Sequence, residues 1–351
     1  MQVLENISLR PYNTFGIDAK ARYMVHIRSV EDLQQLQTLN LMPPAIDKKL
    51  PMLILGGGSN LLLMDDFEGL VLKIDVKGIE KINEDADNVY IKAGAGENWH
   101  SFVMHCIENG WAGVENLALI PGCVGASPMQ NIGAYGVEIK SVFHELTAWN
   151  IEEKCNYTFT LKDCGFGYRD SVFKNKYKDQ FVILNVTYRL NKNPVLNTSY
   201  GAIEQELQRM GVLPMAIGIR DIAQAVINIR SSKLPDPKEI GNAGSFFKNP
   251  SVPKEKYLQL KSAYPDIVGY DNPDGTVKLA AGWLIEHSGP VPGTSWKGYR
   301  MGDAGVHQKQ SLVLVNYGAA TGKQLYELSE NIERTVEDHY GVKLEREVNI
   351  R

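Results

Sequence analysis

Residues 242–250, Asn-Ala-Gly-Ser-Phe-Phe-Lys-Asn-Pro, carry more potential chemistry than any other short stretch of this chain. Three small or polar residues bring the backbone in close, and Ser245 then presents a hydroxyl in front of Phe246 and Phe247. A hydroxyl on a tight turn with an aromatic anchor suits a group that delivers one proton in a fixed direction. The same pattern also fits a well-packed turn with no chemical role.

Glycine-rich loops at 56–60, 94–98 and 121–128 precede this stretch, and the third continues through 130–136. Glycine lets the backbone approach a ligand and lets successive N–H groups converge on an anion. One such loop fits an ordinary turn, but three of them favour a diphosphate cofactor.

Neither standard nucleotide-binding motif is present. Trp99 stands where G-x-G-x-x-G requires its third glycine, and residues 318–323 are one residue short of the P-loop spacing. We interpret 318–323 as the start of a helix.

Two further segments carry charged side chains in suggestive places. Arg169 follows a Gly-aromatic turn in 166–170, where it fits either a surface ion pair or a fork for a substrate carboxylate. Residues 344–348, which include Glu347, carry alternating charges, and we expect a terminal strand there. Such a pattern is normally that of a solvated strand at the edge of a sheet.

The apolar patterns predict the elements that position these residues. We expect strands at 21–27, 52–55, 61–64, 89–93, 142–149, 181–189 and 311–315. We expect helices that begin at Ser29 and that cover 97–108, 219–230 and 321–340. Residues 110–137 are expected to be a long glycine-rich connection, and residues 191–215 hold several turn formers. The strand–glycine loop–strand order over 52–64 differs from the strand–loop–helix order of a Rossmann unit.

The bulk properties restrict the class of protein. A chain of 351 residues predicts two or three domains, and a net charge of -4 argues against binding of nucleic acid or of an anionic membrane. No apolar run is long enough to span a membrane, and the first residues lack a signal-peptide pattern. The four cysteines form no C-x-x-C pair and the seven histidines no metal-binding pattern, so we expect no metal and a reducing, cytoplasmic location.

Taken together, these motifs resemble the UDP-N-acetylenolpyruvoylglucosamine reductases. The likeness runs from Asn13-Thr14-Phe15-Gly16 to 345–348, which is nearly the whole chain. Its most specific stretches are 94–100, 116–136, 166–173, 233–237, 242–250 and 280–285. Residues 194–207, which include Tyr200, look like the loop that closes over the nucleotide sugar in the first type of this family.

The resemblance implies an α+β fold. Its FAD-binding part would be of the vanillyl-alcohol oxidase (PCMH) type, in subdomains 1–76 and 77–218, and a C-terminal α+β substrate-binding domain would cover 219–343. The terminal strand 344–351 would join the first subdomain. The implied activity is reduction of UDP-N-acetylglucosamine enolpyruvate to UDP-N-acetylmuramate, with non-covalent FAD as cofactor and NADPH as co-substrate. The protein would then serve peptidoglycan synthesis, and with it cell shape and division, as a cytoplasmic monomer.

The resemblance also implies roles for single residues. Ser245 would be the general acid, while Arg169 and Glu347 would polarise the substrate carboxylate, with Glu347 protonated when substrate is bound. The substrate-binding residues would be Tyr200, Arg230, Lys233, Asn249, Tyr270 and Gln310. Tyr270 could instead be a packed loop aromatic. The FAD-binding residues would be Gly56, Gly57, Gly58, Ser59, Asn60, Gly122, Gly125, Ala126, Ser127, Ile132, Gly133, Ala134, Tyr135 and Gly136.

Two departures from the family pattern concern the C-terminus. Arg346 occupies a position that is often proline in relatives, and the chain stops at Arg351. We therefore expect Glu347 to lie on a frayed end.

Two other functions remain open at this point. An FAD-linked oxidase or dehydrogenase of an alcohol or lactone would share the flavin fold, often with a histidine bonded covalently to the flavin. A non-catalytic protein that binds a nucleotide sugar or a flavin would share it too.

Overall fold

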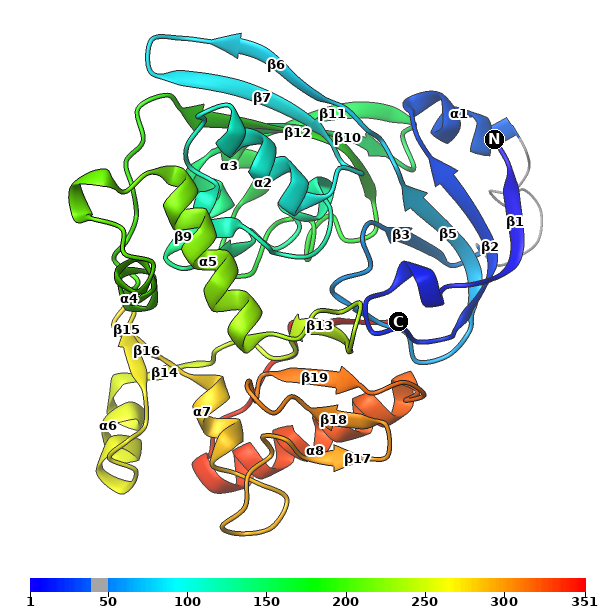
Figure 1. Ribbon diagram of the computed structural model, residues 1–351. Coiled ribbons are helices and arrows are strands. Elements are labelled where there is room, and N and C mark those ends of the chain that lie inside the picture. Colours follow the sequence, from blue (N-terminus) through cyan, green and yellow to red (C-terminus); the bar gives the residue numbers. More distant parts are fainter. Residues whose placement is uncertain (39–49) are drawn as a thin grey trace. The chain divides into compact units, whose positions relative to one another are not determined.

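The computed structural model describes residues 1–38 and 50–351, and the chain forms two compact units (Figure 1). The first unit comprises Met1–Ile7, Ala21–Gly58 and Glu68–Ser232. The second unit comprises Ser8–Lys20, Ser59–Phe67 and Lys233–Arg351. Two short N-terminal segments therefore belong with the last third of the chain.

The first unit contains a four-stranded sheet with the order β1-β2-β5-β3. Its strands are β1 (Val3–Ser8), β2 (Lys20–Ile27), β5 (Phe67–Ile74) and β3 (Met52–Leu55). β3 runs parallel to β5, and helix α1 (Val30–Thr38) follows β2. The buried side chains of β2 and β5 are mostly aliphatic, which suits strands covered on at least one face.

A five-stranded antiparallel sheet of order β11-β10-β12-β7-β6 is the larger sheet of the first unit. Its strands are β11 (Cys155–Thr160), β10 (Phe143–Asn150), β12 (Phe181–Asn191), β7 (Asn88–Gly94) and β6 (Ile79–Glu84). The central strand β12 is nearly all buried, whereas the edge strand β6 is exposed and charged. Charged residues on an edge discourage pairing with another chain.

Helices and a short hairpin complete the first unit. They are α2 (Trp99–Glu108), α3 (Leu161–Cys164), α4 (Gly201–Arg209) and α5 (Ile219–Lys233), with the hairpin β8 (Gly133–Ala134) and β9 (Val137–Glu138). The Asn98 side chain caps α2 by accepting the Ser101 N–H at 2.9 Å.

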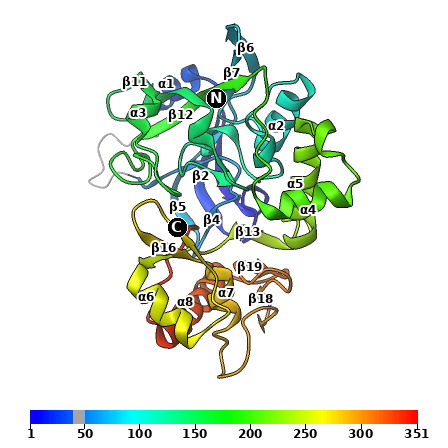
Figure 2. The same ribbon diagram turned by 90° about the vertical axis from the view of Figure 1, so that its left-hand side faces the viewer.

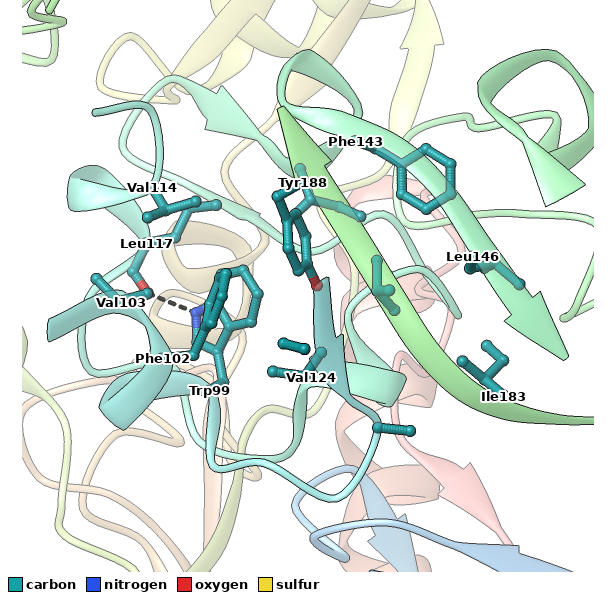
Figure 3. Close-up of a cluster of buried hydrophobic side chains, with 14 of the residues drawn as sticks. Trp99, Phe102, Val103, Val114, Leu117, Val124, Phe143, Leu146, Ile183 and Tyr188 are labelled. Atoms are coloured by element: carbon teal, nitrogen blue, oxygen red, sulfur yellow. Dashed lines mark hydrogen bonds between the residues drawn. The ribbon is translucent and has the colours of Figure 1, made fainter. Parts of the chain in front are cut away.

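Three aromatic side chains lie together among aliphatic ones in the core of the first unit (Figure 3). Trp99, Phe102 and Tyr188 lie ring against ring with centroids 4.8–5.8 Å apart. Their buried polar atoms are satisfied, because Trp99 Nε1 donates to the Leu117 carbonyl at 2.9 Å and the Tyr188 hydroxyl bonds Ser127 Oγ at 2.7 Å. These two hydrogen bonds therefore attach Leu117 and Ser127, both in the connection 110–137, to the core.

The second unit contains three small sheets. The first has the order β13 (Gly241–Ser245), β19 (Val313–Asn316), β18 (Ala304–Val306) and β17 (Arg300–Met301). The others are β14 (Ser251–Pro253), β16 (Thr276–Leu279) and β15 (Gly269–Asp271), and the parallel pair β20 (Asn349–Ile350) and β4 (Leu61–Leu62).

Three helices accompany these sheets: α6 (Lys254–Ala263), α7 (Ala281–Glu286) and α8 (Gly322–Tyr340). α8 contacts β18, β19 and α7, and Figure 2 shows it within this unit. Thr321 caps α8 in a capping box with Gln324, and Gly341 ends it at φ +61°. The predicted helix start at 318–323 is confirmed.

Most predicted strands and helices are present within a few residues. Helix α4, within residues 191–215, was not predicted, because its only buried residues, Ile203 and Leu207, give a weak apolar pattern. The predicted connection at 110–137 includes short helical turns and the start of the hairpin. One expectation is wrong: residues 344–348 are not a strand, because only Arg346 makes a bridge there.

Candidate active site

The three predicted glycine loops meet in the first unit. A Cβ on Gly57 would lie 2.9 Å from Gly122 Cα, and a Cβ on Gly125 would lie 2.5 Å from Ala95 Cβ. Backbone pairing joins the second and third loops, since Gly125 N–H donates to the Ala95 carbonyl at 2.9 Å. These glycines are required because loop packs on loop, and the result is a surface built from backbone.

Some residues predicted for cofactor binding have partners inside the protein. The Ser127 hydroxyl is buried against Tyr188. Ser59 and Asn60 belong to the second unit, and the Asn60 amide donates to the Glu347 carbonyl at 3.1 Å. The contacts of these three residues with FAD stay predictions, as do those of 132–136, where Gly136 is exposed.

Four residues near the glycine loops have a left-handed backbone although they are not glycine. They are Leu119 (φ +59°), Asn131 (φ +45°), Tyr135 (φ +50°) and Arg169 (φ +53°). This conformation costs energy for residues with a side chain, and such residues gather at functional sites. The sequence analysis did not find Asn131 as a support for the site.

Asn131 connects two of the site segments. Its amide donates to Glu138 Oε2 at 2.9 Å and to the Gly167 carbonyl at 3.0 Å, and its Oδ1 accepts the Lys140 N–H at 3.1 Å. Asn131 is fully buried. It therefore holds the 166–170 turn against the hairpin that carries Gly133.

Arg169 projects from that turn. Its Nη2 donates to the Gly133 carbonyl at 2.7 Å, and its guanidinium lies 5.7 Å from the Tyr168 ring. A Cβ on Gly133 would come within 3.4 Å of Arg169 Nη1. The half-buried cation is thus oriented by backbone groups, an arrangement that suits recognition of a carboxylate.

A second cation, Arg230, is held in the same unit. Its Nε donates to the Leu119 carbonyl at 3.2 Å, and the Leu119 N–H donates to His100 Nδ1 at 3.1 Å. Burial, and next the charge of Arg230, lower the pKa of His100 below its ordinary value. His100 is therefore neutral with its proton on Nε2, and it fixes the peptide that orients Arg230. The sequence analysis missed His100.

Tyrosines complete this polar cluster. The Tyr135 hydroxyl bonds Arg230, and burial raises the pKa of Tyr135. The rings of Tyr135 and Tyr200 meet edge to face at 5.2 Å. Burial also lowers the pKa of Arg230, partly offset by Tyr135, and nearby Arg169 adds to the lowering. The predicted residues Arg169, Arg230 and Tyr200 therefore lie in one part of the first unit.

Ser245 ends strand β13 in the second unit, so the predicted tight turn is a strand with an irregularity between Asn242 and Ser245. Gly244 has φ +70°, and its N–H donates to Asn242 Oδ1 at 3.0 Å. The aromatic anchor is confirmed, because Phe246 is 0% and Phe247 is 1% exposed.

The terminal segment pairs with the residues that follow Ser245. Lys248 N–H donates to the Glu345 carbonyl and Glu347 N–H donates to the Phe246 carbonyl, both at 2.8 Å, with Phe247 opposite Arg346. We call this pair of segments, 245–248 and 345–347, the terminal ladder.

The expectation that Glu347 lies on a frayed end is wrong. Beyond it, Asn349 N–H donates to the Asn60 carbonyl at 3.1 Å, and Arg351 N–H donates to the Leu62 carbonyl at 2.9 Å. Backbone hydrogen bonds therefore pair this end of the chain with residues 60–64.

The remaining predicted substrate residues are less closely grouped. Asn249 Oδ1 accepts the Ala281 N–H at 3.0 Å, and Gln310 Oε1 accepts the Leu312 N–H at 3.3 Å. Lys233 is exposed at the end of α5. Tyr270 is 54% exposed on β15, so the alternative of a packed loop aromatic is wrong.

Two negative findings concern the described residues. No group of histidine, cysteine, aspartate or glutamate side chains there could hold a metal ion. No helix in residues 1–38 and 50–351 is long and apolar enough to cross a membrane. All four cysteines are free.

Two family models match this chain. A model described as an FAD-binding domain matches residues 21–152, and a model of the C-terminal domain of UDP-N-acetylenolpyruvoylglucosamine reductase matches residues 236–351. With the converging glycine loops, the first match defines the class: the protein is a flavoprotein that binds FAD.

Curated relatives extend over the whole chain. A UDP-N-acetylenolpyruvoylglucosamine reductase of Flavobacterium johnsoniae is 48% identical over 351 residues and covers 100% of both chains. That of Pseudomonas aeruginosa is 48% identical and covers 100% of this chain and 99% of its own. The chain belongs to the UDP-N-acetylenolpyruvoylglucosamine reductase family.

A solved structure supports the fold. The reductase of Thermus caldophilus, titled a UDP-N-acetylenolpyruvylglucosamine reductase, gives a TM-score of 0.66 at 22% identity, with 100% of this chain and 99% of that chain covered. The predicted α+β fold with an FAD-binding part and the predicted family are confirmed.

Proposed function

We propose that Ser245, Arg169 and Glu347 carry the chemistry of this reductase. As an FAD-dependent enzyme of this family, it reduces UDP-N-acetylglucosamine enolpyruvate to UDP-N-acetylmuramate with NADPH, a step of peptidoglycan precursor synthesis. The main support for Ser245 and Glu347 is the terminal ladder, which fixes the register between Glu347 and the residues that directly follow Ser245. Oriented Arg169 is the second support.

The glycine loops fit FAD, because their close packing gathers the peptide groups of three loops in one place, which suits a diphosphate. Gly56–Gly58, Gly122 and Gly125 would hold the cofactor from the first unit. When bound, FAD would supply hydride transfer from NADPH to the substrate olefin.

The substrate olefin is conjugated to a carboxylate, so added hydride drives negative charge onto the carboxylate oxygens. Arg169 stabilises that charge with a cation that cannot lose its proton. Glu347, protonated in the complex, contributes a second donor, because an ionised carboxylate there would repel the charge. The Ser245 hydroxyl then gives its proton to the adjacent carbon, for which the ladder supplies the geometry.

The other predicted residues position the nucleotide sugar. Arg230 and Lys233 offer positive charge to the diphosphate, and exposed Tyr200 offers a phenol donor. Asn249, Tyr270 and Gln310 complete the predicted set. The three-part division at 1–76, 77–218 and 219–343, the monomeric state and the cytoplasmic location stay predictions.

An anaerobic flavin absorbance trace tests the proposal. NADPH should bleach the yellow protein, and the enolpyruvyl nucleotide should restore the colour. Ser245→Ala should leave bleaching unchanged and slow the return of colour by about two orders of magnitude or more, the scale of a positioned acid. Equal loss in both half-reactions would mean that Ser245 serves only the fold.

Two further outcomes separate the alternative functions. Flavin that stays with the protein after acid precipitation would indicate the covalent linkage common among oxidases. Binding of the nucleotide sugar without any oxidation of NADPH would indicate a non-catalytic binding protein.

A further inference from the structure

Arg346, the residue before Glu347, is fixed on helix α8 by three kinds of contact. Its Nε donates to Ser329 Oγ at 2.9 Å, its Nη2 lies 2.6 Å from Glu333 Oε2, and its guanidinium lies 4.5 Å from the Tyr326 ring. All three partners lie in the second unit with Arg346. We propose that Arg346 is a positioning residue for Glu347, a role that rests on the proposed function of Glu347.

The three partners form one stripe along α8. Residues 326, 329 and 333 are spaced by three and four, so they share a face of the helix. Ser329 is fully buried and donates its own hydroxyl to the Tyr326 carbonyl at 2.6 Å, which orients its oxygen as an acceptor for Arg346. The Ser329 hydroxyl, whose proton is used by the Tyr326 carbonyl, therefore presents its oxygen to Arg346 as an acceptor.

The charge pair is partly shielded from water. The side chains of Arg346 and Glu333 are 21% and 25% exposed. Burial raises the pKa of Glu333, which Arg346 counters and the neighbouring carboxylates Glu330 and Glu337 reinforce. Without Arg346, the Glu333 carboxylate would have only like charges, Glu330 and Glu337, as charged neighbours. The ion pair with Arg346 therefore offsets their repulsion and is more than a loose surface contact.

The geometry of an extended chain transmits this anchor to Glu347. Side chains of successive residues leave an extended segment on opposite sides, and a slip by one residue exchanges the sides. Arg346 on α8 therefore directs Glu347 away from α8. The ladder bonds at Phe246 and Lys248 fix the pairing register of the segment. The contacts of Arg346 fix which of its two sides faces α8 and which faces away from it.

A double-mutant cycle tests this role. Arg346→Ala should slow reoxidation by the enolpyruvyl nucleotide by about tenfold or more, and NADPH should reduce the flavin at an unchanged rate. In a Glu347→Ala background, Arg346→Ala should cause no further loss, because no carboxyl is left to position. Equal loss with Glu347 present and absent would overturn the proposal.

Hydrogen exchange gives a readout that does not depend on activity. Arg346→Ala should increase exchange of residues 344–351 by about tenfold or more and leave 311–316 unchanged. Unchanged exchange of 344–351 would overturn the anchoring role. If Glu347→Ala shows normal reoxidation while Arg346→Ala shows increased exchange of residues 344–351, the proposed function of Glu347 fails. The anchoring of the terminal segment by Arg346 is then still supported.

Two variants control for folding. Arg346→Lys keeps the charge opposite Glu333 but loses the bond to Ser329, so its loss should be intermediate, and it serves if Arg346→Ala does not fold. Arg334→Ala removes an exposed arginine of helix α8, whose Nη2 donates to Asn331 Oδ1 at 2.7 Å, and should change neither readout.

Discussion

The two units of this reductase hold their site residues by different means. In the first unit, the described residues include seven non-glycine positions with positive φ: Asn6, Leu119, Asn131, Tyr135, Lys154, Arg169 and Asp179. In the second unit, all of which is described, only glycines have positive φ. In the first unit the predicted site residue Arg169 lies on a left-handed backbone, whereas in the second unit the segments that carry Ser245 and Glu347 are paired with each other.

This difference indicates where stability and function can be separated. A strained residue is held by its surroundings, so relieving the strain can stabilise the protein while it removes a functional side chain. Paired segments store no strain energy that a substitution could release, because the hydrogen bonds that position Ser245 and Glu347 also hold the chain end. We therefore expect opposite responses to substitution in the two units.

The largest expected effect comes from Arg169. Arg169→Gly and Arg169→Ala should both slow reoxidation by the enolpyruvyl nucleotide by about two orders of magnitude, the scale of one oriented charge-stabilising donor. The glycine variant should be more stable than the alanine variant by about 1 kcal/mol, because glycine accepts φ +53° without strain. Thermal unfolding and stopped-flow absorbance measure the two effects.

The matched change in the second unit is Gly244→Ala. Its φ of +70° disfavours any side chain, although nothing lies within 4 Å of the added methyl group. We expect a loss of about 1 kcal/mol in the free energy of unfolding. Equal stability of both Arg169 variants, or a stabilised Gly244→Ala, would contradict the comparison.

A further effect is expected where loops of the first unit touch. Gly57→Ala would place a methyl group 2.9 Å from Gly122 Cα, so we expect a loss of about 1–3 kcal/mol in stability and a lower FAD content after purification. Gly201→Ala is the control, since nothing lies within 4 Å of its added Cβ. The flavin-to-protein absorbance ratio measures the outcome, and full flavin content in Gly57→Ala would contradict this packing.

The smallest effect concerns two histidines, one in each unit. Burial lowers the pKa values of His100 and His307 below 6.5, with Arg230 and Lys309 adding to the lowering respectively. Above pH 6.5 both histidines are largely neutral in the folded and in the unfolded protein, so neither contributes to the pH dependence of stability. As the pH falls below it, the unfolded chain takes up protons first, so stability is lost.

Replacing these histidines should therefore flatten the pH dependence. Between about pH 7 and pH 5, the free energy of unfolding should fall less steeply in His100→Gln and His307→Gln than in the unchanged protein. Denaturant unfolding at several pH values measures the slope, and parallel curves for all variants would contradict the prediction.

Much of the fold could be predicted from sequence because its signals are local. The capped, apolar stripe of α8 and the alternating run of β12 each lie within one short segment. α4 was missed because two buried residues make too weak a pattern. The left-handed backbone at Leu119 and Arg169 was missed because nothing in those residue types indicates positive φ.

The sequence by itself determined the family, the FAD-binding loops and the chemical types of Ser245, Arg169 and Glu347, since residue types and their order are local facts. Tertiary structure alone decided that Glu347 pairs with Phe246, that Asn60 serves the chain end and that His100 supports Arg230. Glu347 and Phe246 are about 100 residues apart, and no local preference encodes such a pairing. It forms because buried backbone groups must find partners when the chain closes on itself.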